Sequence, residues 1–438
     1  MKFKSVTHLT QAVTILILMV LLAVVSCTSG VDDTDTRVKM LGFSPERLAR
    51  IDSHFHQRVE NDSLPGAVAL IVRHGEVAYF KSFGTADMES GTPMERDAIF
   101  RITSMSIPIT SVAMMMLYEE GHFLLGDPVS AFIPEFEDPQ VLIELNPDDT
   151  TYTTEPANRE ITVRDLLTHT SGIGTGFFQE ELRPIYAKAG ISDAFYLQDV
   201  RLADKIPRLA GLPLLHHPGE GFTYGLSTDV LGYLVEVISG MPLDEFLEER
   251  LFEPLGMRDT HFYLPDEKED RLVPLYRPTE RGYERHTRES MQTTWPNSSP
   301  DYPVEGEKTY FSGGSGLVST ATDYARFLQM LLNGGSLDGS QILSPKSVEL
   351  MTVDHVDVGA DYGLGFFLRK DIKEDELGSA GQFSFSGGFG TTAWVDPMEE
   401  MIGIFMSQAF PPAFRFVQFR VMAYQAITGP GQPSSGAD

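Results

Sequence analysis

Apolar and β-branched residues gather in short runs near both ends of the chain. Residues 66–73 read Gly-Ala-Val-Ala-Leu-Ile-Val-Arg, and a second run at 77–80 follows the turn residues His74-Gly75. Two such runs around a turn predict a β-hairpin. Further runs, separated by Gly and Pro, predict strands at 362–368, 381–386, 391–395 and 402–406.

Between these runs the apolar positions follow a helical period. Residues 102–120 carry apolar side chains at helical spacing and stop at Gly121. Shorter helices are predicted at 165–169, 229–238 and 413–427, and loops at the polar segments 138–160 and 264–308. The pattern predicts an α/β (α+β) fold, in which helices flank an antiparallel sheet built from both chain ends. A mainly helical subdomain is inserted at about 105–307.

The first 26 residues have the layout of a secretory signal peptide. Lys2 and Lys4 precede an apolar run at 12–25, which ends in the small residue Ser26. A transmembrane anchor is the alternative, but the run is short for one. We therefore expect residues 1–26 to be removed from the mature protein.

Cys27 is the only cysteine of the chain, and it follows the apolar run directly. The segment 24–27 resembles a lipobox, whose cysteine is lipidated and becomes the first mature residue. We expect residues 27–42 to be a lipid-anchored flexible linker, 43–428 the folded body and 429–438 a disordered tail. The predicted location is that of an exported lipoprotein, facing the periplasm or on the cell surface.

The charge balance excludes some partners. The chain has 62 acidic against 34 basic residues, a formal net charge of −28. Such a surface repels nucleic-acid phosphates and anionic lipid headgroups, so we expect no nucleic acid and membrane contact only through the N-terminal lipid. The sequence has no His-Glu-x-x-His motif and no set of cysteine ligands, so neither a metal nor another cofactor is predicted.

Several segments together resemble one enzyme family. Residues 100–110, Phe-Arg-Ile-Thr-Ser-Met-Ser-Ile-Pro-Ile-Thr, are similar to the segment that carries the Ser-x-x-Lys motif in class C β-lactamases, DD-carboxypeptidases and family VIII esterases. Family-like blocks follow in the family's order, at 166–173, 222–232, 252–257 and 312–324. The resemblance covers about residues 43 to 428 and implies the serine β-lactamase and penicillin-binding-protein fold.

The resemblance also implies a site. It makes Ser104 the nucleophile, Tyr224 its acid/base partner, and the backbone N–H groups of Ser104 and Gly388 the oxyanion hole. The third motif, usually Lys-Thr-Gly in β-lactamases, is Phe385-Ser386-Gly387 here and is expected to bind substrate. Phe385 replaces a cation that would hold a β-lactam carboxylate, which favours esters over β-lactams.

One position departs from the family. Ile107 stands where the Ser-x-x-Lys lysine would help to take the serine proton. Without that cation, a tyrosine with a pKa of about 10 is ionised in only about one molecule in a thousand at pH 7. Two functions stay open: a serine hydrolase acting on esters or amides through Ser104, or a pseudoenzyme that binds a peptidoglycan-like or small acyl ligand without turnover. The oligomeric state is not predicted.

Overall fold

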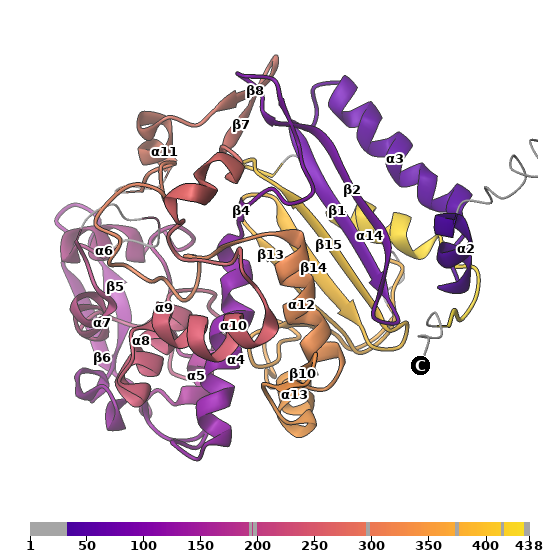
Figure 1. The fold of residues 1–438 in the computed structure, drawn as a ribbon. Coiled ribbons are helices and arrows are strands. Elements are labelled where there is room, and N and C mark those ends of the chain that lie inside the picture. The colour runs from indigo at the N-terminus through magenta and orange to yellow at the C-terminus, as the bar shows by residue number, and fades with distance from the viewer. Residues whose placement is uncertain are drawn as a thin grey trace, which may run out of the picture.

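A seven-stranded antiparallel sheet forms the centre of the molecule. The computed structural model describes residues 33–191, 195, 199–294, 298–372, 376–412 and 416–432. The sheet order is β12-β13-β14-β15-β1-β2-β3. Its strands are β1 (Gly66–Arg73), β2 (Glu76–Asp87), β3 (Thr92–Pro93), β12 (Phe367–Arg369), β13 (Gln382–Gly387), β14 (Thr391–Asp396) and β15 (Met401–Ser407). β1 pairs with β15, so the prediction of one sheet built from both chain ends is confirmed (Figure 1).

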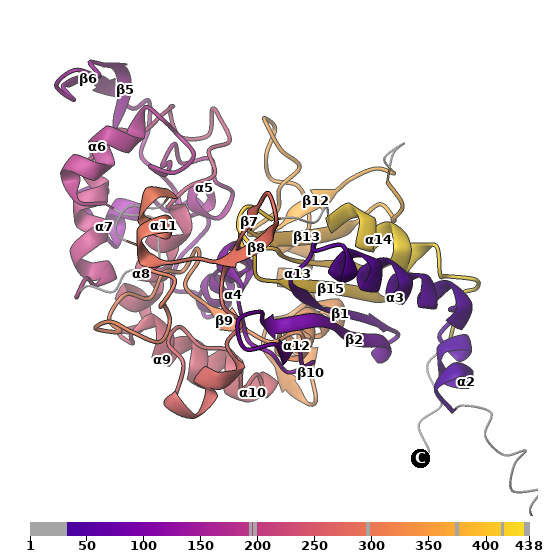
Figure 2. The ribbon, with the colours of Figure 1, turned by 90° about the horizontal axis from the view of Figure 1, so that it is seen from above.

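Helices cover both faces of this sheet. On one face lie α3 (Pro45–Glu60) and α14 (Phe416–Tyr424), which contact each other and pack on β2 and β15. On the other face α12 (Ala321–Leu332) packs on β1 and β15 (Figure 2). Because both faces are covered, every residue of β1 is buried, and its unbroken apolar run follows from that position.

The inserted subdomain lies beside the sheet, and α4 (Ser106–Glu119) connects the two parts. The first twelve residues of α4 are all buried, and its main helical neighbour is α8 (Ser227–Ser239). The other helices are α5 (Val163–Leu167), α6 (Leu182–Ala189), α7 (Leu202–Ala210), α9 (Leu243–Leu247), α10 (Glu253–Leu255) and α13 (Pro345–Met351). Outside the seven-stranded sheet the chain also forms the short turns η1 (Thr103–Met105), η2 (Val129–Ala131) and η3 (Pro134–Phe136) and the π-helical turn η4 (Glu248–Phe252). It also forms the strand pairs β4 (Phe100–Arg101) with β9 (Val318–Ser319) and β10 (Ser336–Leu337) with β11 (Ser340–Gln341), and β10 packs on α12.

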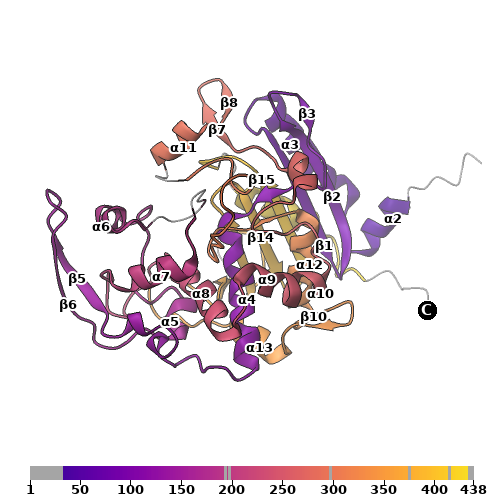
Figure 3. The same ribbon diagram turned by 60° about the vertical axis from the view of Figure 1, so that its left-hand side comes forward.

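Two segments that the sequence predicts as loops contain regular structure. The first holds the hairpin of β5 (Gln140–Leu145) and β6 (Tyr152–Pro156), which projects from the subdomain in Figure 3. The second holds η5 (Asp266–Arg271), the hairpin of β7 (Tyr276–Thr279) and β8 (Gly282–Arg285), and α11 (Arg288–Thr294). The loop prediction is wrong here because these strands are largely exposed and lack the alternation of a half-buried strand.

Part of the predicted flexible linker is folded. Residues 33–42 contain α2 (Asp33–Met40), and Leu41 is fully buried. The Arg73 side chain donates hydrogen bonds to the carbonyls of Leu41 at 2.9 Å and Gly429 at 3.0 Å. The linker prediction is therefore wrong for residues 33–42, and the first residues of the predicted tail are also held, because Gln432 N–H donates to the Met40 carbonyl at 2.8 Å.

Residues 1–32 and 433–438, Cys27 among them, lie outside the described residues. The signal peptide, the lipid anchor and the exported location therefore stay predictions. Within the part of the chain that the structure describes, none of the helices is both long and apolar enough to cross a membrane.

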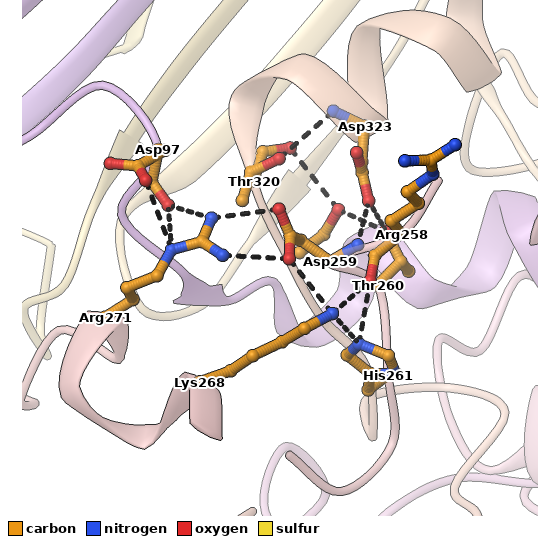
Figure 4. Close-up of polar contacts among 10 residues, drawn as sticks. Asp97, Arg258, Asp259, Thr260, His261, Lys268, Arg271, Thr320 and Asp323 are labelled. Carbon is orange, nitrogen blue, oxygen red and sulfur yellow. Dashed lines mark hydrogen bonds and ion pairs between the residues drawn. The ribbon is translucent and has the colours of Figure 1, made fainter. Parts of the chain in front are cut away.

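A cluster of charged side chains connects the insertion with the N-terminal end of α12. Arg271 donates to both carboxylate oxygens of Asp259 at 2.9 Å, and the Asp259 N–H donates to Asp323 at 2.7 Å (Figure 4). Burial raises the pKa of Asp259, but the hydrogen bonds from Arg271 and Lys268 outweigh it, and the net shift is downward. Burial lowers the pKa of the neighbouring His261 to about 4. The charged groups of this cluster are paired with one another, so we assign the cluster a structural role.

Candidate active site

The turn before α4 holds Ser104 in a strained backbone segment. Thr103 has a φ of +45°, in the left-handed region that a β-branched residue rarely occupies. The end of β13 lies directly against this turn. A Cβ on Gly387 would lie 2.3 Å from the Ile102 carbonyl oxygen and 2.5 Å from Thr103 Oγ1, so only glycine fits there. Tertiary packing stabilises this strained backbone conformation, which places Ser104 at the start of the helix.

A cavity of about 230 Å³ opens at Ser104. Ile107, Tyr224 and Gly388 line it as well, so the structure brings together three segments that are far apart in sequence. A Cβ on Gly388 would meet no atom within 4 Å, which shows that this backbone faces open space. Much of the remaining wall is aromatic, from Phe177, Phe178, Phe195, Phe389 and Phe410.

The hydroxyl groups of Ser104 and Tyr224 face each other at this cavity. Burial raises the pKa of Tyr224, and the Ser104 hydroxyl offsets only part of that rise. The His169 ring packs on the Tyr224 ring with centroids 4.8 Å apart, and burial lowers the pKa of His169 to about 3. At neutral pH Ser104 therefore faces a neutral phenol backed by a neutral imidazole.

Ile107 stands one helical turn beyond Ser104 and is 2% exposed. It supplies a hydrocarbon surface to the cavity where the family places an amine. Among the described residues that line the cavity, none offers an unpaired carboxylate, amine or imidazole to take the Ser104 proton. The structure thus leaves Tyr224 as the group through which that proton can move.

The structure also explains Gly225, which occupies a position where the family often has serine. A Cβ there would lie 2.2 Å from the Ile173 carbonyl oxygen and 2.6 Å from the Gly174 Cα. Both contacts are with backbone, which cannot turn aside as a flexible side chain can. Glycine is therefore required by the close approach of the two loops.

The third motif is placed differently from the expectation. Phe385 is 3% exposed and packs on Phe367, with ring centroids 5.4 Å apart, instead of lining the cavity. Ser386 Oγ is hydrogen-bonded to Thr392 Oγ1 at 2.8 Å. The substrate-binding role predicted for Phe385, Ser386 and Gly387 is thus not supported by their positions. The next residues, Gly388 and Phe389, line the cavity instead, because the chain turns at the end of β13.

Sequence reasoning missed the acidic residue of the cavity wall. Asp229 lies five positions after Tyr224, in the first turn of α8, and is 1% exposed. It forms an ion pair with Lys205 at 2.8 Å, and Lys205 is itself fully buried. The available signal was an acidic residue directly before an apolar run at 230–231. Its partner, on another helix, carried no signal.

The family model described as Beta-lactamase matches residues 51–427, which is most of the chain. The chain belongs to the β-lactamase family. This membership and the sheet topology confirm the resemblance and the fold that the sequence predicted.

Two esterases and one solved hydrolase structure are similar to most of this chain. Esterase EstB of Burkholderia gladioli is 33% identical over 365 residues, covering 80% of this chain and 87% of the relative. Lovastatin esterase of Penicillium rubens is 29% identical over 399 residues, covering 83% and 93%. Among solved structures, EstCE1, a hydrolase with promiscuous acyltransferase activity, matches with a TM-score of 0.73 at 27% identity, covering 88% and 99%. The protein is thus a serine hydrolase-type member of a family that includes esterases and acyltransferases.

Proposed function

We propose that the protein is a carboxylesterase that forms an acyl-enzyme on Ser104. The observation that carries this proposal is that Ser104 and Tyr224 face each other at an apolar cavity whose wall includes Gly388. A hydroxyl paired to a proton-transfer group beside an oxyanion site is the arrangement that acyl transfer needs.

Tyr224 can act in this reaction without becoming a free phenolate. Ser104 Oγ forms a bond to the ester carbonyl carbon while its proton passes to the Tyr224 oxygen, and the Tyr224 hydroxyl proton passes to the leaving alkoxide. The backbone N–H groups of Ser104 and Gly388 stabilise the oxyanion. A water molecule then attacks the carbonyl carbon of the acyl-enzyme and gives its proton to the Tyr224 oxygen, while the Tyr224 hydroxyl proton returns to Ser104 Oγ. The bond between Ser104 Oγ and the acyl carbon breaks, and the carboxylic acid is released. Because no cation assists, we expect turnover well below that of relatives with the lysine.

The cavity favours small, uncharged acyl groups. At roughly 30 Å³ per water-sized group, 230 Å³ holds about seven or eight non-hydrogen atoms. Among the described residues of the wall, Asp229 is the one with an ionisable acidic or basic side chain other than Tyr224, and it is paired with Lys205. A ligand carboxylate placed here would lose hydration without gaining a partner.

Binding without turnover is the second candidate, and Ile107 is the observation that favours it. A buried isoleucine in place of the lysine leaves a shaped pocket whose serine lacks a base. The pocket would then hold a short acyl ligand against Ser104 without cleaving it.

Covalent labelling separates these candidates. We expect an ethyl fluorophosphonate probe to add one adduct to the protein, located on Ser104 by peptide mass spectrometry, and p-nitrophenyl butyrate to be hydrolysed above background. Ser104→Ala is the matched control and should lose both signals. An unlabelled, correctly folded wild-type protein that still binds butyrate would contradict the esterase and support the binding protein.

Substrate preference gives a further prediction. We expect kcat/KM for p-nitrophenyl butyrate to exceed that for nitrocefin by at least about tenfold, since the carboxylate of nitrocefin finds no free cation among the described residues of the cavity wall. The two reactions are followed by absorbance on the same preparation. A preference for nitrocefin would contradict the assignment of the site to neutral esters.

A further inference from the structure

A buried ion pair lies behind the Ser104 cavity and takes no part in the acyl transfer described above. The ammonium of Lys205, on α7, donates to Asp229 Oδ2 at 2.8 Å, and the Tyr310 hydroxyl donates to the same oxygen. The ammonium also lies over the Tyr310 ring, 4.7 Å from its centroid. Both charged residues are almost completely buried, so each depends on the other for compensation.

The other carboxylate oxygen of Asp229 holds the glycine-rich loop at 312–315. Oδ1 accepts hydrogen bonds from Ser312 Oγ at 2.8 Å and from the Gly314 N–H at 3.1 Å. Gly314 and Ser315 form part of the cavity wall. One carboxylate therefore connects Lys205 on one side with the wall of the acyl cavity on the other.

The loop also approaches the start of α8 closely. A Cβ on Gly313 would lie 2.6 Å from the Thr228 carbonyl oxygen, and the Gly313 carbonyl accepts from Thr110 Oγ1 at 2.8 Å. These contacts hold Gly313 without Asp229, whereas its two neighbours Ser312 and Gly314 are held by Asp229 Oδ1. If Lys205 were absent, the buried carboxylate would have to become neutral, recruit water or turn away, and its hold on Ser312 and Gly314 would weaken.

We propose that Lys205 is a positioning residue for the acyl cavity: through Asp229 it fixes the loop 312–315, of which Gly314 and Ser315 line the cavity, and so sets how firmly an acyl group is bound. The consequence for substrate rests on the proposed esterase function. The consequence for the loop does not, because it concerns the free protein.

The test uses three variants of the full chain. Lys205→Met removes the cation and keeps the length of the side chain. Lys205→Met/Asp229→Asn restores neutrality and leaves an amide oxygen to accept from Ser312 and Gly314. Arg73→Met is the matched control, because Arg73 is also a buried cation, 1% exposed and paired with Glu399, but it lies on β1 and does not line the cavity.

Hydrogen exchange of the peptide spanning 310–317 and the KM for p-nitrophenyl butyrate are measured with thermal melts. In Lys205→Met we expect protection of this peptide to fall by at least about tenfold and KM to rise by at least about fivefold, with a smaller change in kcat. The double variant should recover most of both values. Arg73→Met should lower Tm without either effect.

Unchanged exchange at 310–317 in folded Lys205→Met, or an equal loss in Arg73→Met, would overturn the proposal. A loosened loop with an unchanged KM would overturn its substrate part. Wild-type protein that hydrolyses no ester would count against the proposed function alone, because the exchange result still decides whether Lys205 holds the wall.

Discussion

Replacing Ile107 with lysine is expected to raise ester hydrolysis by at least about 10²-fold. The new amine would stand one helical turn from Ser104, where it can draw off the serine proton and favour the ionised form of Tyr224. Ser111 follows one turn later on the same face, and its buried hydroxyl has no hydrogen-bond partner among the described residues, so it is available to the amine. The gain is a fraction of the loss usually seen for an absent catalytic partner, because the pocket is packed around isoleucine.

The measurement is kcat/KM for p-nitrophenyl butyrate with a thermal melt of each variant. Ile107→Met is the control, because it changes the shape of the side chain without adding an amine. A buried lysine can destabilise the fold, so only variants with a cooperative melt are compared. If folded Ile107→Lys gained nothing while wild type hydrolysed esters well through Ser104, another base would be at work and Ile107 would not be the limiting position.

Removing the Tyr224 hydroxyl is expected to lower kcat by roughly 10² to 10⁴, the usual contribution of a positioned proton-transfer group. Tyr224→Phe keeps the ring that packs on His169 and deletes the hydroxyl that faces Ser104. We expect the same substitution to cancel most of the gain in Ile107→Lys, because the amine would act together with this hydroxyl.

Tyr362→Phe is the matched control for this loss. Tyr362 is fully buried, its ring lies 5.5 Å from that of His169, and its hydroxyl has no hydrogen-bond partner among the described residues. It does not line the cavity, so its loss should leave kcat unchanged. Equal activity of Tyr224→Phe and wild type would exclude Tyr224 from the proton path.

The amino-acid sequence by itself determined the sheet and the candidate residues of the site. The run at 66–73 coincides with β1, and the runs at 381–386, 391–395 and 402–406 correspond to β13, β14 and β15, because a buried strand must be apolar wherever its partner lies. The strand predicted at 362–368 is wrong for 362–366, since only its end lies in β12. Ser104 and Tyr224 were found because their motifs are local stretches of chain. The loss of the lysine at Ile107 was visible for the same reason. The hairpin at 276–285 was missed, since exposed strands leave no apolar pattern.

Tertiary structure alone decided what surrounds these groups. The wall of the cavity comes from Phe177, Phe195, Phe389 and Phe410, which no spacing in the sequence relates to one another. The third motif was located from the sequence, but the position of its side chains was not. The turn after β13 places Gly388 and Phe389 in the cavity wall and leaves Phe385 in the core. The pairing of Lys205 with Asp229 joins two helices, and it exists because a buried charge must find its counter-charge wherever packing brings one within reach.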